Sequence, residues 1–331
     1  MSCPDFACMG FQKCGTTTLF EILRQHPDVV LCADVKEPMY YRIPGIIQFL
    51  GRNHRFYRRR YFGSVSADDM RLKGEVNAGL TYTNCAKKVH KNMDPNLKMI
   101  FMMRDPVGRS YSAYKYFLAR GFLPMKAVRY DMEHGHAEGF DHYVHELLDS
   151  PKTRGNIMRK RFKYLTLSQS NYAECIRDYL QYFPRDNMKF IIFEEFVSDQ
   201  HAACREIYDF LGLDDSDEIN YNVRANEGNE CTTGAFRTKK LLVMKFLYYM
   251  FYEFFNMKKW APKLYARFYA GYERVRDKAM RLDEDKSAVK PETRAYLMEY
   301  FEPGLEELSE IIGRDVREIW RKDADPMKRA A

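Results

Sequence analysis

The chain has 331 residues, of which 46% are hydrophobic and 30% are charged. These values are ordinary for a globular protein with a buried core, and they exclude a disordered chain and a small disulfide-stapled scaffold. Lysine and arginine outnumber aspartate and glutamate by 53 to 46, and the net charge of +7 favours anionic ligands without requiring nucleic acid.

The eight cysteines indicate neither a zinc site nor a disulfide framework, because they are scattered, with no Cys-x-x-Cys pair and no neighbouring histidine pattern. We therefore expect a reducing compartment. The N-terminus lacks the basic start and apolar run of a signal peptide, and no stretch reaches the roughly 18 uncharged apolar residues of a membrane span. A cytoplasmic protein is expected, unless the chain has been trimmed of an anchor.

Short apolar runs alternate with helix-length segments, which predicts an α/β protein with a largely parallel central sheet. The first run, Phe6 to Phe11, is followed by Gly15 and an amphipathic helix from Thr16 to Gln25. Further strands are expected at Val29 to Cys32, Lys73 to Val76, Lys98 to Met103 and Lys189 to Phe193. Further helices are expected at Thr83 to Asn92, Val107 to Ala119, Asp141 to Leu148, Asn171 to Phe183 and Asp199 to Leu211, with Gly212 as the C-terminal cap of the last.

The C-terminal third changes in composition. Residues Thr238 to Arg281 mix aromatic and basic side chains and predict two helices broken near Pro262. Two final helices are expected at Pro291 to Phe301 and Pro303 to Ile312, because proline is favoured in the first turn of a helix. We expect one domain over residues 1–331, with 238–281 as a helical aromatic and basic insertion within it.

Residues Gly10 to Leu19 lie where the first strand leads into the first helix, and such a junction favours an anion. The N–H groups of the first helical turn have no intrahelical partner, the helix dipole adds positive potential, and Gly15 permits close backbone approach. Lys13 adds a full charge, and Thr16 to Thr18 add hydroxyl donors. The same residues also fit a plain helix N-terminus with a surface lysine. A Walker A loop needs its lysine after the second glycine, whereas Lys13 precedes Gly15, which argues against an ATP-hydrolysing enzyme.

A second motif follows the expected strand Lys98 to Met103, where the chain reads Arg-Asp-Pro-Val-Gly-Arg-Ser-Tyr-Ser from Arg104 to Ser112. Asp-Pro opens a helix, so Arg104 is expected at the carboxyl edge of the sheet, where open α/β folds bind ligands. Arg109 and Ser112 are three residues apart on one helix face. Taken alone, this segment also fits an aspartate N-cap beside exposed arginines.

Together, the two motifs resemble those of one known protein family. Lys-x-Gly-Thr-Thr-x-Leu resembles the 5′-phosphosulfate loop of sulfotransferases that use 3′-phosphoadenosine 5′-phosphosulfate (PAPS), and Arg-Asp-Pro-x-x-Arg-x-x-Ser-x-Tyr is similar to their 3′-phosphate motif. The likeness is nearest to heparan sulfate N- and 3-O-sulfotransferases and related bacterial enzymes, and it extends from Phe6 to Trp320 without the 238–281 block. It implies a three-layer, P-loop-NTPase-like sulfotransferase fold with a mostly parallel sheet and an added helical segment near the C-terminus.

The resemblance also implies site residues. The 5′-phosphosulfate would be held by Lys13, Cys14, Gly15, Thr16, Thr17 and Thr18, and the 3′-phosphate by Arg104 and Ser112. Glu37 would be the general base for the acceptor hydroxyl, with Lys13 on the bridging oxygen of the donor. The product would be 3′-phosphoadenosine 5′-phosphate (PAP), and this chemistry requires no metal. Apart from the likeness, Glu37 also fits a solvated carboxylate paired with Lys36.

The sequence departs from the family pattern at the third strand. Relatives often carry Glu-Lys there, with the lysine assisting catalysis, whereas this chain has Glu75 followed by Val76. Lys36 or Glu75 is therefore a candidate for the assisting group. Met39 and Arg42 stand roughly where some relatives have a histidine and an aspartate that help the base.

A second departure concerns the nucleotide cover. Relatives close over the nucleotide with a Lys-Gly-Arg loop near the C-terminus, and this chain lacks that loop. Arg281 and Lys286 are the nearest candidates for its role. Arg109 is a further candidate for contact with the donor or the acceptor.

The acceptor is less well indicated. A dense basic run could bind an anionic glycan or form a solvated helix face, and it comprises Arg52, Arg55, Arg58, Arg59 and Arg60. Residues 241–269 are apolar around much of the expected helical circumference, with lysines and arginines between. This composition fits buried helices, a lid over an apolar acceptor, or a peripheral membrane contact that serves a lipid-linked glycan.

The sequence thus predicts a PAPS-dependent O-sulfotransferase that acts on a carbohydrate hydroxyl by in-line transfer, with a glycan acceptor and no nucleic acid partner. Two alternatives stay open. One keeps the donor but uses a small hydrophobic alcohol or a lipid as acceptor, and the other is a catalytically weak protein that binds PAPS or PAP. A nucleotide kinase conflicts with the place of Lys13 in its loop. The sulfated position and the oligomeric state do not follow from the sequence.

Overall fold

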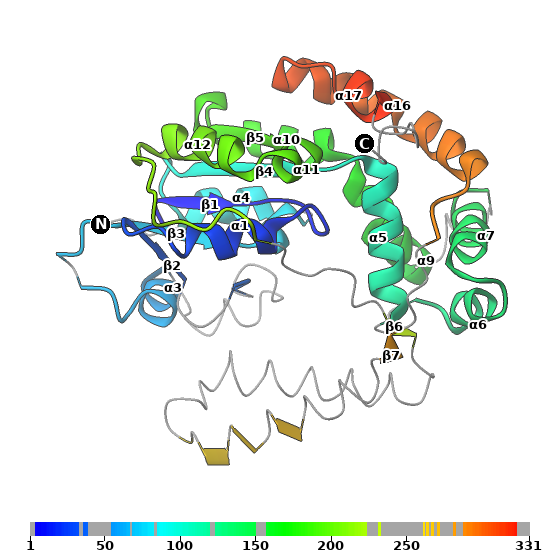
Figure 1. The fold of residues 1–331 in the computed structure, drawn as a ribbon, viewed down its shortest axis with the longest axis horizontal. Coiled ribbons are helices and arrows are strands. Elements are labelled where there is room, and N and C mark those ends of the chain that lie inside the picture. The colour runs from blue at the N-terminus through cyan, green and yellow to red at the C-terminus, as the bar shows by residue number, and fades with distance from the viewer. Residues whose placement is uncertain are drawn as a thin grey trace. The chain divides into compact units, whose positions relative to one another are not determined.

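A computed structural model describes residues 4–32, 36–38, 54–66, 68–82, 85–119, 123–149, 157–223 and 287–322, with a few positions between 231 and 282 (Figure 1). The chain forms two compact units. Unit 1 comprises Met1–Arg109, Leu167–Asn226 and Met298–Ala331, and unit 2 comprises Ser110–Thr166 and Glu227–Leu297. Most of the expected insertion at 238–281 lies outside the described residues, as do Met39, Arg42, Arg52 and Lys286.

Unit 1 is built on a five-stranded parallel sheet with the strand order β2-β3-β1-β4-β5 (Figure 1). The strands are β1 (Phe6–Cys8), β2 (Val29–Leu31), β3 (Leu72–Val76), β4 (Lys98–Met103) and β5 (Met188–Ile192). All three residues of β1 are fully buried, and neighbouring residues of a strand point to opposite faces. Both faces of the sheet are therefore covered, and the expected three-layer α/β arrangement is confirmed.

The helices of unit 1 mostly begin and end close to the expected residues, although no helix was expected at 193–198, and at 54–61 a helix was only one reading of the basic run. They are α1 (Thr16–Leu23), α3 (His54–Tyr61), α4 (Cys85–Asn92), the start of α5 (Pro106–Ala119), α10 (Tyr172–Leu180), α11 (Phe193–Ser198) and α12 (Gln200–Leu211), followed by most of α16 and by α17 near the C-terminus. Helix α12 shows why the ends are predictable. The side chain of Asp199 accepts a hydrogen bond from the N–H of Ala202 at 2.9 Å, and Gly212 ends the helix in the left-handed region at φ 79°.

The structure corrects the expectation of two final helices. Residues Pro291–Ile312 form one helix, α16, with Pro303 inside it. An internal proline removes a backbone donor and costs on the order of 3 kcal/mol. The buried side chains of Phe301, Leu305 and Leu308 follow one face of the helix across the proline. Because each buried side chain of this size contributes about 1.5 to 3 kcal/mol, the helix continues.

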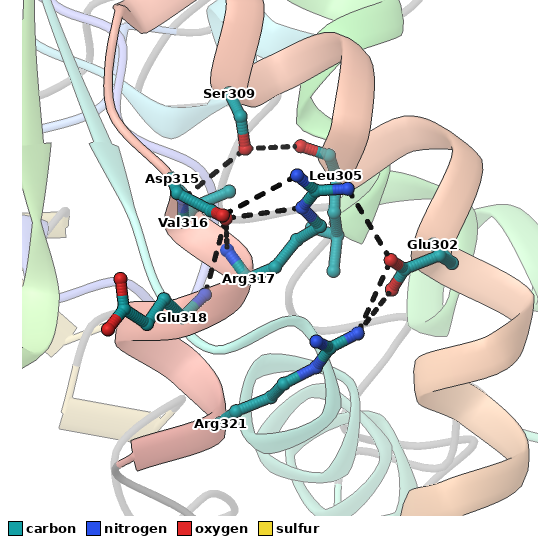
Figure 2. A network of polar contacts seen from close by, with 8 residues as sticks. All are labelled: Glu302, Leu305, Ser309, Asp315, Val316, Arg317, Glu318 and Arg321. Carbon is teal, nitrogen blue, oxygen red and sulfur yellow. Dashed lines mark hydrogen bonds and ion pairs between the residues drawn. The ribbon is translucent and has the colours of Figure 1, made fainter.

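Helix α17 (Val316–Lys322) is fixed to α16 by a network of polar contacts (Figure 2). Asp315 Oδ1 accepts hydrogen bonds from the backbone N–H of Arg317 at 2.9 Å and of Glu318 at 3.3 Å, so Asp315 caps α17. The guanidinium of Arg317 lies 3.7 Å from a carboxylate oxygen of Glu302 on α16. The cap thus begins α17, and the ion pair joins α17 to α16.

Unit 2 is largely helical in its described part. It holds the rest of α5, α6 (Met125–His134), α7 (His136–Leu148), α9 (Ile157–Thr166) and an antiparallel pair of short strands, β6 (Cys231–Thr232) and β7 (Arg281–Leu282). The buried carboxylate of Asp131 accepts a hydrogen bond from the Tyr114 hydroxyl at 2.8 Å and pairs with His136 Nδ1 at 2.7 Å. A Cβ atom on Gly139 would lie 2.5 Å from this carboxylate, so glycine permits the close packing of α7 there. No helix in the described parts of the chain has both the length and the apolar character needed to cross a bilayer.

Candidate functional site

The carboxyl ends of β1 and β4 flank the point where the strand order reverses. From β1 the chain continues to β2 on one side of the sheet, and from β4 it continues to β5 on the other. Open α/β sheets bind ligands in the crevice at such a point. The loop after β1 and the segment after β4 meet here, since Arg104 Nη1 donates a hydrogen bond to the carbonyl oxygen of Lys13 at 3.4 Å.

The loop after β1 has the backbone shape of an anion site. Lys13 has φ 72° and Gly15 has φ 83°, so two residues lie in the left-handed region. For Lys13 this conformation costs about 1 to 3 kcal/mol, and such strain is typical of functional loops. A Cβ atom on Gly15 would lie 2.7 Å from the ring of Phe193, so this position needs glycine for space as well as for φ. No side chain caps the start of α1, which leaves its first N–H groups to face the loop.

The thiols near the loop are neutral groups. Burial raises the pKa of Cys14 to about 12, although Arg109 and Arg104 act in the opposite direction. Burial likewise raises the pKa of Cys8, at the end of β1, to about 11. Neither sulfur is a thiolate nucleophile at neutral pH. The backbone N–H of Cys14 donates to the Phe11 carbonyl oxygen at 3.2 Å, so Cys14 stabilises the turn of the loop, and its side chain does not act as an anion.

Arg104 is fixed by its neighbours at the carboxyl edge. Its carbonyl oxygen accepts a hydrogen bond from the Tyr172 hydroxyl at 2.7 Å, and its guanidinium lies 4.7 Å from the ring centroid of Phe193. The next residue, Asp105, donates its N–H to Glu194 Oε1 at 3.0 Å. These contacts hold the backbone on both sides of the Arg104 side chain.

Glu194 connects this corner to the C-terminal helix. The buried indole of Trp320 on α17 donates to Glu194 Oε2 at 3.1 Å, and its ring lies 6.0 Å from that of Tyr172. Burial raises the pKa of the Glu194 carboxyl. Tyr172, Phe193 and Glu194 are not among the site residues expected from the sequence. The one available signal was the Phe-Glu pair directly after the last strand, at the ligand-binding edge of a parallel sheet.

A second segment approaches the loop. Lys36 Nζ donates hydrogen bonds to Thr16 Oγ1 at 3.1 Å and to Thr17 Oγ1 at 2.9 Å, and it lies 3.6 Å from Glu37 Oε1. Glu37 is therefore linked through one lysine to the first turn of α1. The solvated ion pair suggested by the sequence is present, but Lys36 is largely buried and also binds the helix.

Glu75 lies behind this segment as a fully buried carboxyl. It accepts a hydrogen bond from the Tyr57 hydroxyl and one from Asn77 Nδ2 at 2.5 Å, and Asn77 Nδ2 also donates to the Pro38 carbonyl oxygen at 2.8 Å. Burial raises the pKa of Glu75 to about 7, and the charge of Glu37 acts in the same direction. Glu75 thus supports the segment that carries Glu37 and does not face solvent.

The structure brings most of the expected site residues together through these contacts, namely Lys13, Cys14, Gly15, Thr16, Thr17, Thr18, Lys36, Glu37 and Arg104. Arg109 is fully buried and donates from Nε to Ser170 Oγ at 2.6 Å, so it fastens α5 within the fold. Ser112 lies on α5 in unit 2, where it is half-buried. Arg281 lies in β7, and Lys286 lies outside the described residues.

The chain matches one known protein family and several curated proteins. The family described as the sulfotransferase domain matches residues 4–277. Mouse heparan sulfate glucosamine 3-O-sulfotransferase 3B1 is 27% identical over 218 residues, which cover 63% of this chain and 46% of that protein. Human carbohydrate sulfotransferase 15 is 25% identical over 257 residues, with coverage of 63% and 44%. The chain thus spans about half the length of these curated relatives.

A solved structure supports the fold. The crystal structure of a sulfotransferase from Alicyclobacillus acidocaldarius superposes with a TM-score of 0.57 at 22% identity, and the match covers 97% of this chain and 100% of that one. This likeness concerns the fold, which agrees with the strand order and the parallel sheet described above.

Proposed function

Because the chain belongs to the sulfotransferase domain family, which matches residues 4–277, we propose that it transfers a sulfuryl group from PAPS to a hydroxyl of a carbohydrate acceptor. The observation that supports this most is the meeting of two cationic elements at the carboxyl edge of the sheet. The strained loop around Lys13 and the guanidinium of Arg104 are joined by a hydrogen bond of 3.4 Å. A donor with a 5′-phosphosulfate and a separate 3′-phosphate needs two such anion sites.

The residues would divide the donor between them. The N–H groups of the first turn of α1, the Thr16 to Thr18 hydroxyls and Lys13 would bind the 5′-phosphosulfate. Arg104 would bind the 3′-phosphate, because its planar fork can donate two parallel hydrogen bonds to one phosphate. Ser112 stays a further prediction for that phosphate.

Glu37 is proposed as the general base. The acceptor oxygen forms a bond to sulfur while the bond from sulfur to the bridging oxygen breaks, and the electron pair of that bond goes to the 5′-phosphate of PAP. The proton of the acceptor hydroxyl goes to Glu37. Lys13 would offset the negative charge that develops on the bridging oxygen.

The proposed acceptor class rests on the relatives. The names of two matched proteins refer to heparan sulfate glucosamine and to carbohydrate. The basic residues Arg58, Arg59 and Arg60 on α3 suit an anionic glycan. The aromatic block at 241–269 that prompted the apolar acceptor lies mostly outside the described residues.

The donor site can be tested by calorimetric titration of PAP and of ADP, which lacks the 3′-phosphate, into the wild type and Arg104→Ala. We expect the wild type to prefer PAP, and the variant to lose about ten- to hundredfold in PAP affinity, since a charge-assisted phosphate contact contributes about 1.5 to 3 kcal/mol. Arg71→Ala is the matched control, because Arg71 precedes β3 at the opposite edge of the sheet and pairs with Asp69 at 2.7 Å.

Equal binding of ADP and PAP by the wild type, or no binding of either, would refute the donor site. If PAP binds as expected, incubation with PAPS should sulfate desulfated oligosaccharides in preference to apolar alcohols. The reverse preference would move the acceptor to the hydrophobic class. Tight PAP binding without turnover on either class would favour the catalytically weak binding protein.

A further inference from the structure

The side chain of Lys36 makes contacts that constrain the hydroxyls around it. Its ammonium group lies within hydrogen-bond distance of Thr16 Oγ1 and Thr17 Oγ1, at 3.1 and 2.9 Å, and 3.6 Å from Glu37 Oε1. An ammonium group donates three hydrogen bonds and accepts none. Both threonine oxygens must therefore act as acceptors toward Lys36, and their own protons point elsewhere.

The position of Lys36 is fixed by the segment that carries it. Asn77 Nδ2 donates to the Pro38 carbonyl oxygen at 2.8 Å, and Asn77 Oδ1 accepts from the N–H of Gly79 at 2.9 Å. The Lys36 side chain is only 22% exposed. A long cationic side chain loses conformational freedom and hydration when it is buried in this way. This loss costs free energy, which a favourable interaction with an anionic ligand would offset.

The third strand supplies no cation at this edge. Its last residue, Val76, is apolar and 1% exposed, so any positive charge that joins Lys13 near the first turn of α1 comes from another element. Lys36 supplies that charge from the segment between β2 and α3, beside the proposed base Glu37.

We infer that Lys36 binds the phosphosulfate end of the donor and orients the Thr16 and Thr17 hydroxyls as donors toward it. The inference rests on the proposed function. With both threonine oxygens accepting from Lys36, their protons are available to the anionic oxygens of the donor, and the ammonium adds a full positive charge to the same cradle. Burial lowers the pKa of Lys36, whereas the neighbouring Glu37 raises it, and an anion in the cradle would further favour the charged form.

The test compares two nucleotides that differ only at the 5′ end, PAP and adenosine 3′-phosphate. The ratio of their affinities isolates the 5′-phosphate contacts. In Lys36→Met this ratio should fall tenfold or more, whereas Lys36→Arg, which keeps the charge, should retain most of it. Lys73→Met is the matched control, because Lys73 is also half-buried and donates to two backbone oxygens, those of Asp69 at 2.6 Å and Arg71 at 2.9 Å.

A double-mutant cycle with Thr17→Val separates orientation from simple charge. The double variant carries both Lys36→Met and Thr17→Val. If Lys36 orients the Thr17 hydroxyl, the fold-loss in the affinity ratio of the double variant should be smaller than the product of the fold-losses of the two single variants. A folded Lys36→Met protein with an unchanged affinity ratio would overturn the inference. If the fold-losses of the two single variants simply multiply in the double variant, Lys36 does not orient the Thr17 hydroxyl. A wild type that binds neither nucleotide would instead refute the proposed function. If Lys36→Met does not fold, Lys36→Gln takes its place in the measurement of the affinity ratio and in the double-mutant cycle with Thr17→Val.

Discussion

At the residue scale, Glu75 is the titratable group with the clearest consequence for stability. It is fully buried, and its pKa is raised by burial from 4.5 to about 7. Between these two pH values the folded protein holds a proton that the unfolded chain releases. The free energy of unfolding therefore falls as the pH rises from about 4.5 to about 7 and levels off above that, with a total effect of about 3 kcal/mol.

Glu75→Gln should remove this pH dependence, because glutamine keeps the shape of the side chain but does not titrate. Urea unfolding at pH 5 and pH 8 measures the difference. We expect the wild type to lose about 2 to 3 kcal/mol more than the variant between these two pH values. All other titrating groups are shared by the two proteins and cancel in the comparison.

A second variant, Glu37→Gln, tests whether the charge of Glu37 contributes to the raised pKa of Glu75. The charge of Glu37 is one of the causes that raise the pKa of Glu75, so its removal should shift the stability transition to lower pH. Parallel pH dependences of the wild type and Glu75→Gln would show that Glu75 does not titrate in this range. An unshifted transition in Glu37→Gln would mean that the two carboxyls are not coupled.

At the element scale, helix α17 depends on its N-cap. Asp315 accepts two backbone N–H groups in the first turn, and α17 carries the buried Trp320, whose indole binds Glu194. Loss of an aspartate cap costs about 1 kcal/mol. Asp315→Ala should therefore lower the free energy of unfolding by about this amount, whereas Asp315→Asn, which keeps the Oδ1 acceptor, should lower it by less. Urea unfolding followed by tryptophan fluorescence measures both.

The comparison between these two variants decides whether the capping hydrogen bonds or the charge of Asp315 stabilises α17. The exposed Asp315 also forms an ion pair with the half-buried Arg317, and ion pairs at the protein surface contribute little to stability. If Asp315→Asn is as unstable as Asp315→Ala, the charge of Asp315 matters more than its capping hydrogen bonds, and the cap is not what stabilises α17.

The elements differ in how well the sequence predicts them. Strand β4 and helix α12 begin and end within a residue of expectation, because a buried apolar run and a capping Asp199 with Gly212 are local signals. The fusion of two expected helices into α16 was not predictable, since the burial that carries the helix past Pro303 is tertiary. The passage from strand to loop to helix around Gly15 was predictable from the sequence, whereas phosphate binding by that loop stays a prediction. The hydrogen bond from Asn77 to Pro38 was not, because it joins residues 39 positions apart.

At the scale of the whole molecule, the loop after β1, Arg104 and Trp320 all belong to unit 1. A ligand that binds only the folded protein raises its free energy of unfolding by about 2.7 kcal/mol at a concentration of 100 times the Kd. For a folded unit of the size of unit 1, this amounts to a rise in Tm of about 5 to 10 °C. PAP should therefore shift the transition in which unit 1 unfolds.

The chain offers a reporter for that transition. It contains two tryptophans, and Trp260→Phe leaves Trp320 of unit 1 as the single one. In this variant, PAP at 100 times its calorimetric Kd should raise the fluorescence midpoint by about 5 to 10 °C, and ADP at the same concentration should raise it less. A midpoint that moves equally with both nucleotides would mean that binding does not depend on the 3′-phosphate. A midpoint that moves with neither, while calorimetry shows binding, would place the nucleotide outside the part of the chain that unfolds around Trp320.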